Sequence, residues 1–374
     1  MVTGTKHAEK IITELLATAG IIINGNNSWD IHVHDARFFS RLIVDAELAF
    51  GESYVDGWWD CAAIDECVNR ALSGHVEKQL TGWKSALRII LSKILNFQSK
   101  SRAFVVGEKH YDLGNDLYQA MLDKRMNYTC AYWKNATDLD QAQVAKLDLV
   151  CKKIGIRKGM RILELGCGWG SFARYAAEKY GAEVTGVTVS KEQVELGNQL
   201  CRGLPVELRL QDYREIHGKY DAVISIGIME HVGYKNYRTY MQVVDRCLKK
   251  DGIAFIHTIG RNDSATNTNA WINKYIFPNS MLPSIAQLSQ AAEGLLMIED
   301  LHNIGPHYDK TLMAWCANFE RAWPKFKDRY GERFYRMWRF YLLSCAGSFR
   351  ARSNQLWQFV MTKNGTTQPE CRFS

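Results

Sequence analysis

Seven residues at positions 164–170 have the types and spacing to bind a nucleotide-like ligand. They follow a short apolar run at 160–163 and precede a helical pattern at 172–180. A buried strand that ends in an acidic residue and turns through three alternating glycines into a helix exposes bare backbone, which such a ligand can approach closely. A glycine-rich turn is by itself a weak signal, so a tight turn with a purely structural role is the alternative.

The spacing of these glycines favours S-adenosylmethionine over a dinucleotide. A dinucleotide fingerprint is Gly-x-Gly-x-x-Gly, and Ser171 stands where its third glycine would be. An acidic residue two positions before the first glycine suits the cationic ammonium and sulfonium of S-adenosylmethionine, which carries no phosphates. The residues of this segment that we expect to bind the cofactor are Glu164, Gly166, Cys167, Gly168, Trp169 and Gly170.

Helical patterns alternate with short β-branched runs around this turn and beyond it. Such alternation predicts an α/β fold, a parallel sheet with helices on both faces. Ligands of such sheets lie at the carboxyl ends of the strands. The predicted strands are 161–165, 183–189, 206–210, 222–226 and 253–258, and the predicted helices are 147–153, 172–180 and 192–201.

Polar residues follow the second and third of these strands. Thr188, Ser190 and Gln193 stand where a dinucleotide enzyme often places an acid for the ribose, although Ser190-x-x-Gln193 is also a capping-box pattern at a helix start. The run Gln211-Asp212-Tyr213 follows the third strand. There a carboxylate could accept a hydrogen bond from an adenine amino group, with aromatic surface stacking on the ring, or the acid could simply be a solvated loop residue.

Acid and imidazole groups follow the fourth strand and occupy the fifth. Glu230 and His231 are adjacent at the mouth of the predicted sheet, and we expect one to be catalytic and the other structural. His257 lies in an otherwise apolar strand, where a lone histidine is either a satisfied core residue or, next to the crevice, part of the site.

The composition is that of an ordinary globular protein and excludes several classes of function. The chain has 374 residues with 47% hydrophobic and 23% charged side chains, and its net charge of +7 is too small for a dedicated nucleic-acid binder of this length. Ten cysteines without a Cys-x-x-Cys pair argue against zinc and disulfide frameworks. We therefore expect free thiols, no metal and a cytoplasmic protein. No stretch approaches the roughly 20 apolar residues of a transmembrane helix.

We expect three parts along the chain. A small, mainly helical domain covers residues 1–96, a linker covers 97–110, and the cofactor-binding domain covers 111–374. Apolar spacing typical of helices, punctuated by glycines, indicates the first domain. Its predicted helices are 6–16, 37–49 and 64–72.

Three further segments carry expectations of their own. Residues 83–95 form an amphipathic, basic helix, whose apolar face either packs in the core or settles on anionic lipid. Beyond residue 271 the chain is rich in aromatics and helical pattern, which suggests helical additions that cover the site. The last residues, 365–374, show no motif and are expected to be frayed.

Several segments of the chain together strongly resemble the bacterial cyclopropane-fatty-acyl-phospholipid synthases, over about residues 20–357. Besides the glycine turn they are Tyr128-Thr129-Cys130-Ala131-Tyr132-Trp133, Met229-Glu230-His231-Val232-Gly233, His257-Thr258-Ile259-Gly260 and, near the amino terminus, Gly51-Glu52-Ser53-Tyr54-Val55-Asp56-Gly57-Trp58-Trp59. The resemblance implies a Rossmann-like class I methyltransferase domain with helical additions, preceded by the small helical domain. It also implies that Tyr128 and Thr129 join the residues that bind S-adenosylmethionine.

The resemblance implies that a methylene group is added to the cis double bond of an unsaturated acyl chain in a membrane phospholipid, which forms a cyclopropane fatty acid. The alkene would take the methyl group from the sulfonium, and the resulting carbocation would lose a proton to a bound bicarbonate ion. Carried over to this sequence, the residues that would hold bicarbonate are Cys130, Glu230, His257, Ile259 and Tyr308.

Some of these residues have simpler alternatives. Cys130 could be a small packing residue and Tyr308 a surface residue. Cys345 lies in a family-like Ser-Cys-Ala-Gly setting, yet the mechanism needs no enzyme nucleophile, so we favour packing in the pocket wall for it. Ser171-Phe172 replaces a common Gly-Leu of the relatives, and Thr129 a common serine; both keep size and polarity near enough for cofactor binding.

The resemblance also implies partners and a location. We expect unsaturated phospholipids at the membrane surface as substrate, no nucleic acid, a homodimer, and peripheral association with the cytoplasmic face of the inner membrane. Two other functions stay open on the sequence alone. One is a soluble methyltransferase acting on nitrogen or oxygen of a small molecule, and the other is a lipid-binding protein without enzymatic activity.

Overall fold

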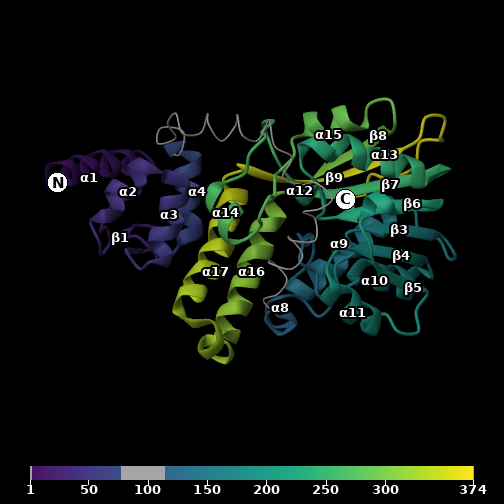
Figure 1. Ribbon diagram of the computed structural model, residues 1–374, viewed down its shortest axis with the longest axis horizontal. Helices are drawn as coiled ribbons and strands as arrows, with labels where there is room; N and C mark the ends of the chain where they lie inside the picture. Colours follow the sequence, from purple (N-terminus) through teal and green to yellow (C-terminus); the bar gives the residue numbers. More distant parts are fainter. Residues whose placement is uncertain (1, 77–113, 374) are drawn as a thin grey trace. The chain divides into compact units, whose positions relative to one another are not determined.

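The computed structural model describes residues 2–76 and 114–373 (Figure 1). These residues fall into two compact units, each built from three segments of the chain. The amphipathic stretch at 83–95 and the predicted linker at 97–110 lie outside the described residues. The described part of the first unit is 2–76, 267–278 and 308–354, and that of the second is 114–266, 279–307 and 355–373.

The first unit is mainly helical, as predicted. The helix predicted at 37–49 is two helices, because the backbone at Asp45 is not helical (φ −156°, ψ 82°) and its side chain accepts a hydrogen bond from the Leu48 N–H. The elements of this unit are α1 (Val2–Thr18), β1 (His32–Val33), α2 (Arg37–Val44), α3 (Ala46–Val55), β2 (Trp59–Asp60), α4 (Ile64–Ser73), α14 (Ala270–Tyr275), most of α16 (Pro306–Ala322), η3 (Trp323–Lys325) and α17 (Lys327–Arg350).

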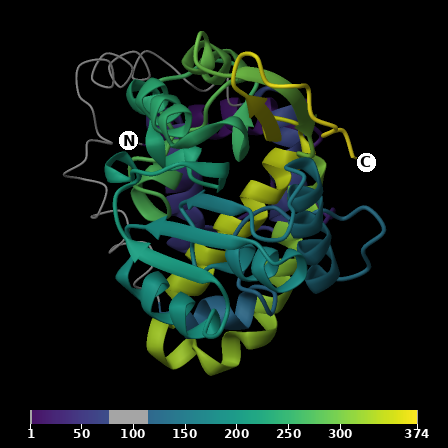
Figure 2. The same ribbon diagram turned by 90° about the vertical axis from the view of Figure 1, so that its right-hand side faces the viewer.

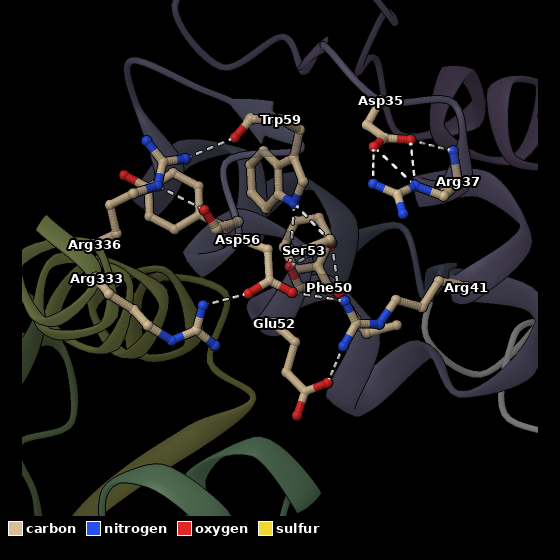
Figure 3. Close-up of polar contacts among 12 residues, drawn as sticks. Asp35, Arg37, Arg41, Phe50, Glu52, Ser53, Asp56, Trp59, Arg333 and Arg336 are labelled. Carbon is tan, nitrogen blue, oxygen red and sulfur yellow. Dashed lines mark hydrogen bonds and ion pairs between the residues drawn. The ribbon is translucent and has the colours of Figure 1, made fainter.

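Polar contacts hold α17 against the amino-terminal helices (Figure 3). Arg336 of α17 donates to the carbonyl oxygens of Tyr54 (2.6 Å) and Trp59 (2.9 Å), while Arg333 pairs with Asp56. The buried indole of Trp59 donates in turn to the Ser53 hydroxyl at 3.1 Å. These bonds satisfy backbone and side-chain groups that would otherwise be buried without a partner.

Two glycines allow the close approach of helices in this unit. A Cβ at Gly51 of α3 would lie 2.4 Å from the indole nitrogen of Trp271, and a Cβ at Gly347 of α17 would lie 2.3 Å from the carbonyl oxygen of Asp65. The amino-terminal helices thus share one packed core with α14 and α17. Both of these helices lie in the range 111–374, where the cofactor-binding domain is predicted. The division into functional domains at 1–96 and 111–374 stays a prediction.

The second unit is built on one seven-stranded sheet with the order β5-β4-β3-β6-β7-β9-β8 (Figures 1 and 2). Pairing is parallel from β5 through β7 and antiparallel between β8 and β9. The first five strands in this order, numbered along the chain, follow the 3-2-1-4-5 sequence of a Rossmann sheet. The strands are β3 (Arg161–Leu165), β4 (Glu183–Thr188), β5 (Val206–Leu210), β6 (Tyr220–Ile226), β7 (Leu248–Arg261), β8 (Met297–Asn303) and β9 (Asn354–Thr362).

Alternate residues of the central strands enter two cores, one on each face of the sheet. Leu163 and Val223 pack with α13 and α15, whereas Ile162 and Ile224 pack with α9 and α10. This is the period of two expected for a sheet that is covered on both sides. The helical segments of this unit are α8 (Asn115–Met121), α9 (Leu139–Lys153), α10 (Ser171–Tyr180), α11 (Lys191–Leu200), η1 (Tyr213–Glu215), α12 (Met229–Val232), η2 (Tyr234–Asn236), α13 (Tyr237–Cys247) and α15 (Ile285–Ala292).

One expectation about the carboxyl-terminal part is incomplete, and another is wrong. The region beyond residue 271 contributes strands β8 and β9 to the sheet, in addition to helices. The tail is not frayed at Cys371, which is 5% exposed and packs in the core with α9. Lys153, itself fully buried, pairs with Asp300 at 2.6 Å and donates a hydrogen bond to the carbonyl oxygen of Cys371 at 3.3 Å. The second bond holds the carboxyl-terminal tail against α9.

Among the described helices we find none with the length and hydropathy needed to cross a bilayer.

Candidate active site

The glycine turn after β3 has the backbone that the sequence predicts. Gly166, Gly168 and Gly170 have φ values of +74°, +54° and +77°, which favour glycine. A Cβ at Gly166 would press on Ile228 at 3.1 Å and one at Gly170 on Leu208 at 2.9 Å, whereas a Cβ at Gly168 would meet no atom within 4 Å. Gly168 is therefore the position at which bare backbone faces open space.

A cavity of about 200 Å³ opens at this turn. Its wall comes from the carboxyl ends of β3, β4, β5 and β6, from the loop before α9, and from α9 itself, in keeping with the crevice rule for open parallel sheets. Of the predicted cofactor residues only Gly170 does not line it. Those that do are Tyr128, Thr129, Glu164, Gly166, Cys167, Gly168, Trp169, Thr188, Ser190, Gln193, Gln211, Asp212 and Tyr213.

Glu164 is the buried acid of this cavity. Its side chain is 3% exposed, and burial raises its pKa to about 8, against the opposing effect of the Lys146 charge. Its Oε2 atom has no hydrogen-bond partner within the described part of the chain. A buried carboxyl group in this state is matched to a ligand that carries hydrogen-bond donors and positive charge.

Lys146 of α9 lines the same cavity, and sequence reasoning missed it. Its ammonium donates to Asn127 Oδ1 and to Thr129 Oγ1, both at 3.0 Å, and the Ser171 hydroxyl donates to the same Asn127 oxygen at 2.8 Å. The signal was present in the sequence. Lys146 falls in a helical stripe of buried residues at i, i+3, i+4, i+7 and i+8 from Leu139, where a charged residue is unusual.

The residues after β4 form a local hydrogen-bond group. Ser190 caps α11 by accepting from the Gln193 N–H (3.3 Å), but the Gln193 side chain accepts from the Thr188 hydroxyl (2.8 Å) instead of completing a capping box. The Ser190 N–H donates to that same hydroxyl at 3.3 Å. Ser190 thus has the structural role of a helix N-cap, without the full capping box. The side chains of Thr188, Ser190 and Gln193 nevertheless border the cavity.

Asp212 is buried and bound to an arginine that the sequence analysis did not consider. Arg214 donates to both carboxylate oxygens, through Nε at 2.8 Å and Nη2 at 2.7 Å, and its backbone N–H donates to Oδ1 at 2.9 Å. Arg214 also lines the cavity. Asp212 is therefore not a solvated loop acid, and an adenine amino group would share its carboxylate with this ion pair.

Glu230 and His257 lie near the ends of β6 and β7, and neither lines the cavity. Glu230 Oε1 accepts from the backbone N–H of Ile259 at 2.6 Å, and burial raises the pKa of Glu230 to about 7. Gln358 donates to His257 Nδ1 at 3.3 Å, which leaves the proton of the neutral ring on Nε2. Within the described residues, Glu230 Oε2 and His257 Nε2 are buried and have no hydrogen-bond partner.

Other predicted catalytic residues stand in different surroundings. Cys130 is fully buried, outside the cavity wall, and its thiol donates to the Ala131 carbonyl oxygen at 3.2 Å. The Ile259 N–H is engaged by Glu230, as described above. His231, next to Glu230, lines the cavity instead, and burial lowers its pKa to about 4.

Tyr308 and Cys345 belong to the first unit. Tyr308 is 7% exposed and packs on Phe349, with 4.6 Å between ring centroids, so it is not a surface residue. Burial raises the pKa of the Cys345 thiol to about 12, which keeps it protonated and unreactive. Their predicted roles beside Glu230 and His257 stay predictions.

Alanine at Gly168 should mainly weaken cofactor binding, whereas alanine at Gly170 should mainly lower stability. Both substitutions place alanine in a left-handed backbone conformation, which lowers the stability of the folded state by about 1–2 kcal/mol. Gly168→Ala adds a methyl group to open space at the cavity wall, so we expect affinity for S-adenosylhomocysteine to fall about tenfold or more. Gly170→Ala adds a clash with Leu208, so we expect the larger loss of thermal stability and the smaller loss of affinity. Calorimetric titration and thermal unfolding of both variants check this, and equal effects would contradict it.

Comparison with known proteins gives one consistent family. The chain matches the model of the mycolic acid cyclopropane synthetase family over residues 98–359. It is 50% identical over 355 residues to cyclopropane-fatty-acyl-phospholipid synthase of Escherichia coli strain K12, which covers 95% of this chain and 93% of that protein. The solved structure of mycolic acid cyclopropane synthase CmaA1 with SAH and CTAB is similar with a TM-score of 0.66 and 31% identity, over 70% of this chain and 98% of that one. Coclaurine N-methyltransferase, at 22% identity and a TM-score of 0.69 over 84% and 99% of the two chains, shares the fold.

Proposed function

The chain belongs to the mycolic acid cyclopropane synthetase family, and from this premise we propose that it adds a methylene group from S-adenosylmethionine to the cis double bond of an unsaturated acyl chain in a phospholipid. It is a methyltransferase that depends on S-adenosylmethionine. The observation that carries the proposal is the cavity at the strand ends, where the bare backbone of Gly168 and the buried carboxyl of Glu164 face one space.

The reaction needs an orienting, dry site more than it needs a nucleophile. The π electrons of the alkene form a bond to the methyl carbon, the sulfonium leaves as a neutral sulfide, and a carbocation remains on the acyl chain. Loss of a proton from the new methyl group closes the ring. Burial holds the pKa of His257 well below its ordinary value, so this ring adds no positive charge beside the developing cation, and the ionised form of Glu230 would stabilise it.

A bicarbonate ion is the base we propose for that proton. Two buried atoms support this choice: the Nε2–H of His257 can donate to an oxygen of bicarbonate, and Glu230 Oε2, which has no partner among the described residues, can accept from the O–H group of that ion. Cys130 and Ile259 would contribute to its surroundings. When bound, bicarbonate would supply a weak base that does not trap the carbocation.

The substrate sets where the protein must work. Acyl chains esterified in phospholipid lie in a bilayer, so we propose peripheral association with the inner membrane from the cytoplasmic side and a homodimer as the working form. The basic, amphipathic sequence at 83–95 supports a contact with anionic lipid.

Incubation with S-adenosylmethionine and vesicles of unsaturated phospholipid tests the proposal. We expect each modified acyl chain to gain one CH₂ and to lose its alkene, which mass analysis after acyl-chain release detects. Matched vesicles of saturated phospholipid serve as the control and should gain nothing. Methyl transfer to nitrogen or oxygen of small acceptors, without acyl modification, would contradict the proposal, as would vesicle binding without any transfer.

A further inference from the structure

The cavity contains a buried cation with no role in the function proposed so far. Lys146 is 1% exposed, and two of its three ammonium protons are donated to Asn127 and Thr129. Because Lys146 also forms part of the cavity wall, it has one further donor to offer a ligand there. A buried ammonium retained at a cavity wall is costly unless it meets an anion.

The charges of two carboxyl groups raise the pKa of Lys146, against the larger lowering that burial causes. They are Glu164, on the cavity wall, and Asp123, whose carboxylate is engaged by the side chain and backbone of Asn127 at 2.9 and 2.7 Å. Asp123 therefore belongs to the support of the loop before α9. Glu164 keeps an oxygen without a partner in the described part of the molecule, so the wall of this one cavity contains both a cation and an acid.

An α-amino acid zwitterion matches this pair. Its ammonium suits the carboxyl of Glu164, and its carboxylate suits the ammonium of Lys146. Such a ligand brings no net charge into the buried cluster, so both groups gain a partner without an uncompensated charge. The amino-acid end of S-adenosylmethionine is such a zwitterion.

We propose that Lys146 binds the carboxylate of the cofactor's amino-acid end while Glu164 binds its ammonium, an assignment that rests on the proposed function. Gln193 and Asp212, which follow β4 and β5 and border the same cavity, would then be available to the rest of the cofactor. By holding Asn127 and Thr129, Lys146 also fixes part of the loop before α9 that lines the cavity.

Two probes measure the carboxylate contact directly. S-adenosylhomocysteine carries the carboxylate, and its decarboxylated analogue has hydrogen in that place. The native protein should bind S-adenosylhomocysteine about 10- to 100-fold more tightly than the analogue, which is the range expected for a hydrogen bond between charged groups. Calorimetric titration of the full chain with each probe gives this ratio.

The variant Lys146→Met then completes a thermodynamic cycle. We expect it to lose most of the preference, because its affinity for S-adenosylhomocysteine falls while its affinity for the analogue changes little. Lys146→Arg, which keeps the charge, should retain part of the preference. An equal loss for both probes would make Lys146 a support of the loop only and would overturn the inference.

The outcomes separate this inference from the function beneath it. If the native protein binds both probes equally, the inference fails even where Lys146→Met does not fold, and the proposed function stands. If the native protein binds neither probe, the proposed function itself fails.

Discussion

Glu230→Gln should abolish ring formation while leaving cofactor binding nearly intact. In the native protein the Ile259 N–H donates to Glu230 Oε1 at 2.6 Å, and the amide oxygen of glutamine can accept this bond as well. The amide nitrogen, which is a donor, replaces the second, buried carboxylate oxygen. The variant can therefore neither carry the negative charge nor accept at that position. We expect methylene transfer to fall by about 100-fold or more, which is the usual loss for a positioned acid–base or charge-stabilising group.

Affinity for S-adenosylhomocysteine should change by no more than about threefold in Glu230→Gln, because Glu230 does not line the cavity. Acyl-chain mass analysis and calorimetric titration measure the two quantities on the same preparation. Glu293→Gln is a matched control, since this exposed acid ends α15 and should leave activity unchanged. Activity above one tenth of the native rate in Glu230→Gln would remove Glu230 from the catalytic group.

Gly260→Val should strongly destabilise the second unit. A Cβ at Gly260 of β7 would lie 2.0 Å from Cζ3 of Trp357, a buried residue of the neighbouring strand β9. The indole is held in the core that contains Met281 and Leu288, so it cannot move aside cheaply. We expect a loss of about 3 kcal/mol or more for valine and about 1–3 kcal/mol for alanine, seen as a lower midpoint of thermal unfolding.

The steric cause can be separated from the loss of glycine as such. Gly294 has a positive φ (+71°), but a Cβ added there would meet no atom within 4 Å. Gly294→Ala should therefore lower the free energy of unfolding by only about 1–2 kcal/mol. Trp357→Phe should restore part of the stability of Gly260→Ala, because the smaller ring leaves room for the new methyl group. Additive losses in the double variant would show that Trp357 is not the obstacle.

The central sheet could be read from the sequence because its signals are local. Strands β3 and β5 occupy the predicted residues, and the turn after β3 has the glycine conformations that its spacing demanded. The apolar run of β3 specifies a buried parallel strand, and the alternating pattern of β5, in which only Leu208 is buried, specifies a strand that is covered on one face.

What the sequence did not reveal depends on distant partners. Strand β9 is buried on both faces and β8 is a polar edge strand, so neither shows the alternation typical of a half-covered strand. Burial of Cys371 depends on Lys153, more than two hundred residues earlier. Lys146 was missed because the predicted helix began at residue 147, whereas α9 begins at Leu139, so the buried stripe that contains Lys146 was not recognised.

The three-segment construction of the first unit has a consequence for synthesis. Its last segment ends at Asn354, so the packing of Trp59 and Gly51 against α14 and α17 cannot be completed until almost the whole chain has left the ribosome. At roughly 5–20 residues per second the amino-terminal helices wait roughly 15–60 s for their partners. During that time their apolar faces are open to chaperones, and the nascent protein cannot mature in simple order from its first residue to its last.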